Sequence, residues 1–288
     1  MWCSVPARSL RCLVRVRSRV ASSWLSCPEG AAVFYPRLML LVADVHGAFS
    51  ALATVAQIGE PLLILGDLLN FVDYRTNEGM LAEVTGKEFV AELSRLRNSG
   101  DLEGSRLLWA ERHAGREDEI RARYAQLIDA AYLEAAGALV GAETYVTYGN
   151  ADRPDLLQAC LPPESRFVDG EVVEIEGHAV GFVGGGIKGI GVPGEVSEST
   201  MADKLASLGE VEILCTHVAP AIRSLSGDVI GGRLKQSEAV REFLEERQPP
   251  WHYFGDIHQP QATTWRFGRT TCRNVGYFRA TGRPVRHG

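Results

Sequence analysis

The chain has few lysines, no long apolar run and no paired cysteines. Arginine outnumbers lysine 26 to 4, as GC-rich coding would produce. No stretch approaches the roughly 18 apolar residues of a membrane-spanning helix, so no membrane association is expected. The six cysteines include no Cys-x-x-Cys pair, which argues against both a disulfide framework and a thiolate zinc site. This cysteine usage suits a reducing compartment, and we expect a cytoplasmic protein.

The net charge of −6 is unevenly distributed along the chain. Residues 1–38 carry six arginines against the single acid Glu29, a balance of +5, so the remainder carries −11. A nucleic-acid-binding protein needs a basic face. A long nucleic acid is therefore not an expected partner of the acidic body.

Residues 1–38 form a basic segment with two competing interpretations. It lacks the continuous apolar region of a secretory signal, although its arginines and serines resemble an organellar transit peptide. It is either a disordered or targeting leader or the product of a mis-chosen start codon, since Met39 stands just before the first convincing strand. We assign the folded domain to residues 39–288.

Three apolar runs in the first half each end in a polar turn: "LMLLVADVHG", "PLLILGDLLN" and "ETYVTYGNAD". A helix is expected after the first run, and strand–helix alternation predicts an α/β fold with its ligands at the carboxyl ends of the strands. Residues from about 71 to 142 are rich in charge and in helix formers, which predicts a helical insertion over the site.

The second half is predicted to be richer in strands. The stretch "RFVDGEVVEIEGHAVGFVGGG" has the pattern of a hairpin. After residue 165 we expect five strands and two helices. Two β-sheets packed face to face, with helices outside them, are the simplest architecture.

Seven oxygen or nitrogen donors stand directly after apolar strands. Each alone is typical of a hydrogen-bonded turn, but their order along the chain is informative. They are Asp44, His46, Asp67, Asn150, His217, Asp256 and His258.

From about Met39 to about Val275 the chain resembles the calcineurin-like metallophosphoesterases. That family shows Asp-x-His, Gly-Asp, Gly-Asn, a lone His and Gly-His-x-His in this order. The resemblance implies a four-layer α/β/β/α sandwich of two mixed β-sheets with flanking helices. The matching blocks here are Asp44-Val45-His46, Gly66-Asp67, Gly149-Asn150, His217 and Gly255-Asp256-Ile257-His258.

The resemblance also implies two divalent metal ions, about 3.5 to 4 Å apart, and hydrolysis of a phosphomonoester or phosphodiester by a metal-bound hydroxide. Mixed oxygen and nitrogen donors suit manganese, iron or zinc. By resemblance Asp67 bridges the metals, the first metal takes Asp44, His46 and His258, and the second takes Asn150 and His217.

Two positions depart from the family pattern. Asp256 stands where a histidine usually binds the second metal. We expect Asp256 to bind that metal, to lower the charge of the site from about +2 to about +1 and to hold metal more tightly. The alternative is that Asp256 is only a turn residue. Ala151 replaces the usual proton donor, whose help is typically worth about 10² to 10⁴ in rate. Asp152 and His113 are the candidate substitutes.

"GGGIKG", residues 184–189, matches a dinucleotide-binding pattern, but Pro193 and further glycines follow where a helix should begin. A flexible loop near the metals is the better interpretation. We expect a metal-dependent hydrolase with Asn150 and Asp152 as catalytic residues. Its expected substrate is a phosphorylated small molecule or a nucleotide, and its oligomeric state is left open. The alternative is a metal-binding regulatory or scaffold protein with little activity.

Overall fold

The computed structural model describes residues 37–189, 191–229 and 234–287. Residues 1–36, and with them almost all of the expected leader, lie outside the described residues. Arg37, just before the expected boundary, forms ion pairs with Glu143 at 2.7 Å and with Glu176 at 2.8 Å. The backbone N–H of Leu38 also donates to a carboxylate oxygen of Glu60.

The first sheet has five strands in the order β13-β1-β2-β3-β4. Strands β1 to β4 are parallel to one another, and the edge strand β13 is antiparallel to β1. The bounds are β1 (Leu40–Val42), β2 (Leu62–Leu65), β3 (Thr144–Thr147), β4 (Ser165–Phe167) and β13 (Val285–Arg286).

The second sheet has six strands in the order β11-β12-β10-β9-β6-β5. Its four inner strands are parallel, whereas β5 and β11 are antiparallel edge strands, so this sheet is also mixed. A separate parallel pair joins β7 (Gly186–Ile187) to β8 (Glu195–Val196). The bounds of the six strands are β5 (Glu171–Ile175), β6 (His178–Val183), β9 (Ile213–Thr216), β10 (Trp251–Phe254), β11 (Thr264–Phe267) and β12 (Thr270–Asn274).

Successive side chains of each strand point alternately into different apolar layers, of which the two sheets define three. In β1, Leu40 and Val42 pack with the helices α1 (Phe49–Ala56) and α5 (Glu117–Leu139), whereas Leu41 packs between the two sheets. In β9 the alternation continues, because Cys215 faces the space between the sheets and Leu214 packs with α7 (Glu198–Ser207) and α9 (Glu238–Arg247). The predicted α/β/β/α sandwich is therefore confirmed.

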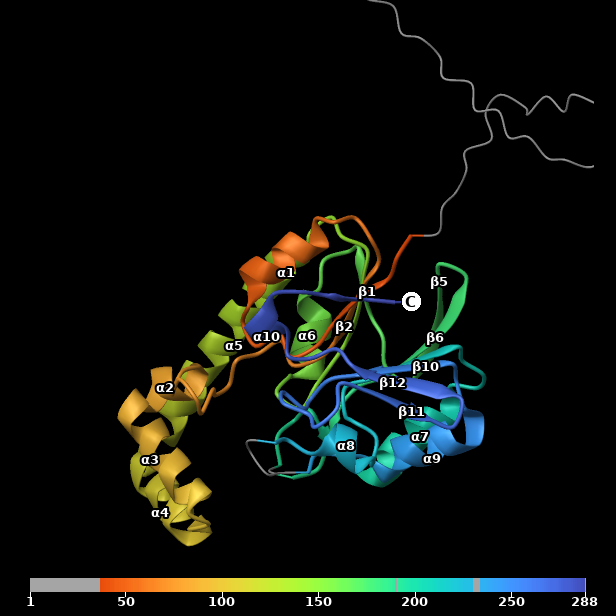
Figure 1. Cartoon of the computed structure of the whole chain (residues 1–288). Helices are drawn as coiled ribbons and strands as arrows, with labels where there is room; N and C mark the ends of the chain where they lie inside the picture. Colours follow the sequence, from red (N-terminus) through yellow and green to blue (C-terminus); the bar gives the residue numbers. More distant parts are fainter. Residues whose placement is uncertain (1–36, 190, 230–233, 288) are drawn as a thin grey trace, which may run out of the picture. The chain divides into compact units, whose positions relative to one another are not determined.

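The insertion contains α2 (Met80–Thr85), α3 (Lys87–Asn98), α4 (Leu102–His113) and the start of α5. Figure 1 shows α2, α3 and α4 extending away from the sheets. They share a small core that includes Leu81, Phe89, Val90 and Leu93. Helix α5 then returns to the first sheet and buries Tyr132 and Leu139 there.

After residue 164, the described residues hold ten strands and four helices instead of the expected five and two. Strands of two or three residues, such as β4 and β13, are too short to show an alternating pattern. The remaining helices of the described part are α6 (Pro154–Cys160), α8 (Arg223–Ser226) and α10 (Phe278–Thr281). None of the helices described is both long and apolar enough to cross a bilayer.

Candidate metal centre

Four of the seven expected ligands adopt a left-handed backbone conformation directly after a strand. Such a conformation is uncommon for residues other than glycine. It costs free energy and tends to occur at functional sites, where the surrounding structure enforces it. The φ angles are 58° for Asp44, 41° for His46, 56° for Asp67 and 65° for Asp256.

The glycines that precede the ligands allow the strand ends to pack closely. A Cβ atom on Gly149 would lie within 3.0 Å of Oδ1 of Asp67, and one on Gly66 would lie within 3.0 Å of the backbone nitrogen of Gly149. Gly66 also has a φ of 92°, which L side chains rarely adopt. The Gly-Asp and Gly-Asn patterns thus reflect a steric requirement of the site.

A first group of donors comes from the ends of β1 and β10. Asp44, His46 and His258 place ligand atoms within 4.8 Å of one another. Nε2 of His46 lies 3.2 Å from Nε2 of His258, which in turn lies 3.6 Å from Oδ1 of Asp44. These three side chains could hold one metal ion.

A second group centres on His217, which follows β9. Its Nε2 lies 3.5 Å from Oδ1 of Asp67 and 3.3 Å from Oδ1 of Asn150. Asp44, Asp67 and His217 also place ligand atoms within 4.8 Å of one another. Oδ1 of Asp256 lies farther from His217 Nε2, at 4.0 Å.

The carboxylate of Asp67 faces both groups. Its Oδ2 lies 3.6 Å from Nε2 of His46, and its Oδ1 faces His217. Each oxygen therefore points to a different set of donors, as a bridging carboxylate requires.

Hydrogen bonds to the backbone fix the histidine tautomers. Nδ1 of His46 lies 2.8 Å from the carbonyl oxygen of Leu69, and Nδ1 of His217 lies 2.8 Å from that of Leu65. A carbonyl oxygen only accepts, so each Nδ1 donates and each neutral ring presents a lone pair on Nε2. These lone pairs face oxygen and nitrogen acceptors, and a cation satisfies such an arrangement.

The site concentrates negative charge in a buried place. Asp44, Asp67 and Asp256 are all buried, and buried carboxylates need a compensating charge. Burial opposes the charge of Asp44, but His258, His217 and His46 hold its pKa well below the ordinary value. Burial also disfavours charge on His217, yet Asp67 and Asp256 raise its pKa. The position attracts positive charge, and the donor set fits a divalent metal ion.

Lys235 was not identified from the sequence. Its Nζ lies 2.5 Å from Oδ1 of Asp256. The expected fall in site charge counted Asp256 without this lysine, whose charge offsets that of the aspartate. One signal was available: Lys235 is one of only four lysines in an arginine-dominated chain.

The two candidate proton donors lie in different surroundings. Asp152 is completely buried, and its carboxylate accepts hydrogen bonds from the backbone N–H groups of Asp67, Leu68 and Gly149. Burial and the charge of Asp67 raise the pKa of Asp152. His113 lies at the end of α4, where its ring stacks on that of Trp109 with the ring centroids 4.2 Å apart. Asp152 thus braces the turns that carry Asp67 and Asn150, whereas the described contacts of His113 are with the insertion.

The glycine-rich segment 184–189 packs against the turn that carries Asn150. A Cβ atom on Gly186 would lie 2.7 Å from Cβ of Asn150. The segment lies beside this candidate ligand, as expected, and Gly186 and Ile187 within it pair with β8. Its glycines permit close backbone approach to Asn150.

Residues after β12 contact the first group of donors and were missed, because they follow the last matching block. The ring of Tyr277 stacks on His258 with centroids 4.0 Å apart. The guanidinium of Arg279 donates to the carbonyl oxygen of His46 at 2.5 Å. From the insertion side, Nη2 of Arg75 donates to the hydroxyl of Tyr277 at 3.0 Å.

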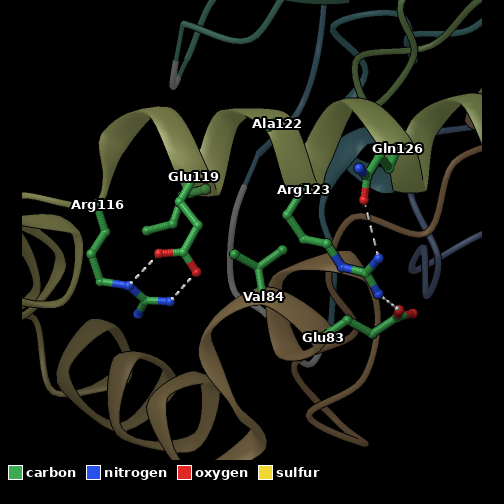
Figure 2. Close-up of a pocket in the computed structure, with 8 residues that line it drawn as sticks. Glu83, Val84, Arg116, Glu119, Ala122, Arg123 and Gln126 are labelled. Carbon is green, nitrogen blue, oxygen red and sulfur yellow. Dashed lines mark hydrogen bonds and ion pairs between the residues drawn. The ribbon is translucent and has the colours of Figure 1, made fainter.

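A separate pocket of about 420 Å³ lies between α2 and α5, and no metal-centre residue lines it. Figure 2 shows its charged side chains paired with one another: Arg116 with Glu119 at 2.8 Å, and Arg123 with Glu83 at 3.9 Å. Because both arginines are paired, this pocket does not offer an unpaired cation to a phosphate.

Comparisons with known proteins support the fold alone. No family model matches the chain, and no curated protein matches it. One crystal structure aligns with a TM-score of 0.54 at 15% identity, over 85% of this chain and 92% of the other. TT1561 of Thermus thermophilus aligns with a TM-score of 0.49 at 13% identity, over 88% and 99%. The first alignment agrees with the sandwich architecture.

Proposed function

We propose that this chain is a metal-dependent phosphoesterase of the calcineurin-like type with two divalent ions. The observation that carries the proposal is the orientation of Asp67, whose two carboxylate oxygens face His46 and His217 respectively. Bound divalent ions would neutralise phosphate oxygens and lower the pKa of a water molecule. The mixed oxygen and nitrogen donors favour manganese, iron or zinc.

The protein's own groups position these donors. Leu65 and Leu69 carbonyls orient the rings of His217 and His46, and Asp152 holds the turns after β2 and β3. The half-exposed guanidinium of Arg75, in the insertion, donates to Tyr277, and the ring of Tyr277 stacks on His258. A positive charge from the insertion thus lies near the candidate ligands. This arrangement supports a role of the insertion in admitting a phosphorylated small molecule or a nucleotide. We propose a cytoplasmic location on the cysteine pattern.

Hydrolysis of an aryl phosphodiester and an aryl phosphomonoester with added Mn²⁺ tests the proposal. Asp67→Asn and His217→Ala should each lower kcat/KM more than about 100-fold, because even outer partners of metal ligands are worth about 10- to 100-fold. Asp129→Asn, at an exposed position on α5, is the control and should keep full activity. Undiminished turnover in both site variants would refute the assignment.

A metal-binding regulatory or scaffold protein is the second candidate. Two features favour it. The ion pair between Lys235 and Asp256 engages a candidate metal ligand, and Ala151 stands where the family usually has a proton donor for the leaving group. This candidate predicts bound metal without turnover of either ester. The same assay combined with elemental analysis separates the two functions.

A further inference from the structure

Lys235 reaches the metal centre from a segment just before α9. Its Nζ donates to Oδ1 of Asp256 at 2.5 Å and to the carbonyl oxygen of the same residue at 3.2 Å. Asp256 is buried, whereas the Lys235 side chain keeps 44% of its surface exposed. Lys235 therefore enters from an exposed segment and places its ammonium against the buried carboxylate.

The bonded oxygen is also the one that faces the second group of donors. Oδ1 of Asp256 lies 4.0 Å from Nε2 of His217, the central atom of that group. A divalent ion bound there through Asp256 would lie close to an ammonium that already holds the same oxygen. Like charges at such separations repel, and more strongly in a partly buried site than in water.

The two groups of donors are consequently unequal. In the first group, Oδ2 of Asp67 adds a second carboxylate to the three donors already described, which are Asp44, His46 and His258. Asp44 and Asp67 belong to both groups, and the second group adds His217, the neutral amide of Asn150 and Asp256, whose charge Lys235 offsets. The ammonium of Lys235 lies on the oxygen of Asp256 that faces the second group, so the second position carries a nearby positive charge.

We propose that Lys235 is a positioning residue that weakens the second metal position by holding Asp256, so that the two ions bind with unequal affinity. This inference rests on the proposed function, since it requires a two-metal centre. The replacement of the usual histidine by Asp256 then has a consequence. Oδ1 of Asp256 can bind the second ion only when Lys235 releases it.

Stepwise Mn²⁺ binding to the metal-free full-length chain, followed by calorimetry and by elemental analysis after dialysis, tests the proposal. The unaltered protein should bind one ion tightly and a second at least about tenfold more weakly. Lys235→Gln should tighten the second ion about tenfold and leave the first unchanged. Lys235→Arg retains the positive charge and should keep the second ion weak.

Lys87→Gln is the matched control, because Lys87 pairs with Glu78 at 3.2 Å on the exposed insertion; both affinities should stay unchanged. Equal affinities in the unaltered protein, or a second affinity that Lys235→Gln does not alter, would overturn the role of Lys235. Either result with metal-dependent hydrolysis intact rejects this inference alone. A chain that binds no divalent ion and hydrolyses neither ester rejects the proposed function itself.

Discussion

The surroundings of Asp152 favour a structural role over that of a replacement proton donor. Its Oδ2 accepts from the backbone N–H groups of Asp67 at 2.7 Å and of Gly149 at 2.9 Å, and its Oδ1 accepts from that of Leu68 at 3.0 Å. One buried carboxylate therefore ties the turn after β2 to the turn after β3. Both turns carry expected metal ligands.

Asp152→Asn should lower the free energy of unfolding by about 1 to 3 kcal/mol, because an amide NH2 group cannot accept the backbone N–H groups that one carboxylate oxygen accepts. Urea unfolding of the metal-free protein measures this change. Asp129→Asn, at an exposed position, should unfold like the unaltered protein. Unaltered stability together with slower ester hydrolysis would instead support the proton-donor role.

The sequence indicated the candidate ligands that the structure brings together, but it did not indicate their supporting partners. Asp44 and Asp67 could be found because each follows an apolar strand at a fixed spacing from a glycine or histidine. The contact between Lys235 and Asp256 spans 21 residues, and no local pattern encodes it. The hydrogen bonds of Asp152 go to backbone groups, which look the same in every sequence.

At the scale of the elements, the short helix α10 supports the turn that carries Asp44 and His46. The backbone N–H of Phe278 donates to the carbonyl oxygen of Ala43 at 3.0 Å, and that of Arg279 donates to the carbonyl oxygen of Asp44 at 3.1 Å. The Phe278 side chain is fully buried in the core between the first sheet and its helices. The helix thus joins the apolar core to the backbone of a ligand.

Phe278→Ala should lower the free energy of unfolding by about 3 to 5 kcal/mol, because the cavity adds to the lost burial of the ring. Leu133→Ala, at an exposed site on α5, should change it by less than about 0.5 kcal/mol. Both values come from denaturant titrations. A loss below about 1 kcal/mol for Phe278→Ala would mean that α10 contributes little to the core.

Prediction succeeded for elements with a clear repeat and failed for brief ones. The apolar runs correspond to β1, β2 and β3, and the predicted helical insertion corresponds to α2 to α5. Strand β13 has two residues, and its place beside β1 depends on tertiary packing. The strands of the extra pair β7–β8 have two residues each and lie close to Asn150, an arrangement that no sequence periodicity predicts.

At the scale of the whole folded unit, the expected ligands come from both sheets. Asp44, Asp67 and Asn150 follow strands of the first sheet, and His217 and His258 follow strands of the second. A bound ion would therefore link the two sheets at their carboxyl ends. Metal binding and folding should be coupled, because the ligand set does not exist in the unfolded chain.

Mn²⁺ at about 100 times its dissociation constant should stabilise the protein by about 2.7 kcal/mol. For a chain of this size that corresponds to a rise in Tm of roughly 5 to 10 °C. Calorimetry with and without a chelator measures the shift, and His258→Ala should reduce it. An identical Tm in chelator and in excess Mn²⁺, Zn²⁺ or Fe²⁺ would argue against a metal centre that joins the sheets.

The antiparallel pairing of β13 with β1 bears on biosynthesis. Strand β1 is translated long before its outer neighbour, which consists of residues 285–286, and His287 then donates to the carbonyl of Met39 at 3.0 Å. Until those residues leave the ribosome, the nascent chain exposes an uncovered, apolar strand edge, which is a site of mispairing. A chain stalled or clipped before residue 285 would keep that edge open and become a target for chaperones and proteases, even though every expected metal ligand had already been synthesised.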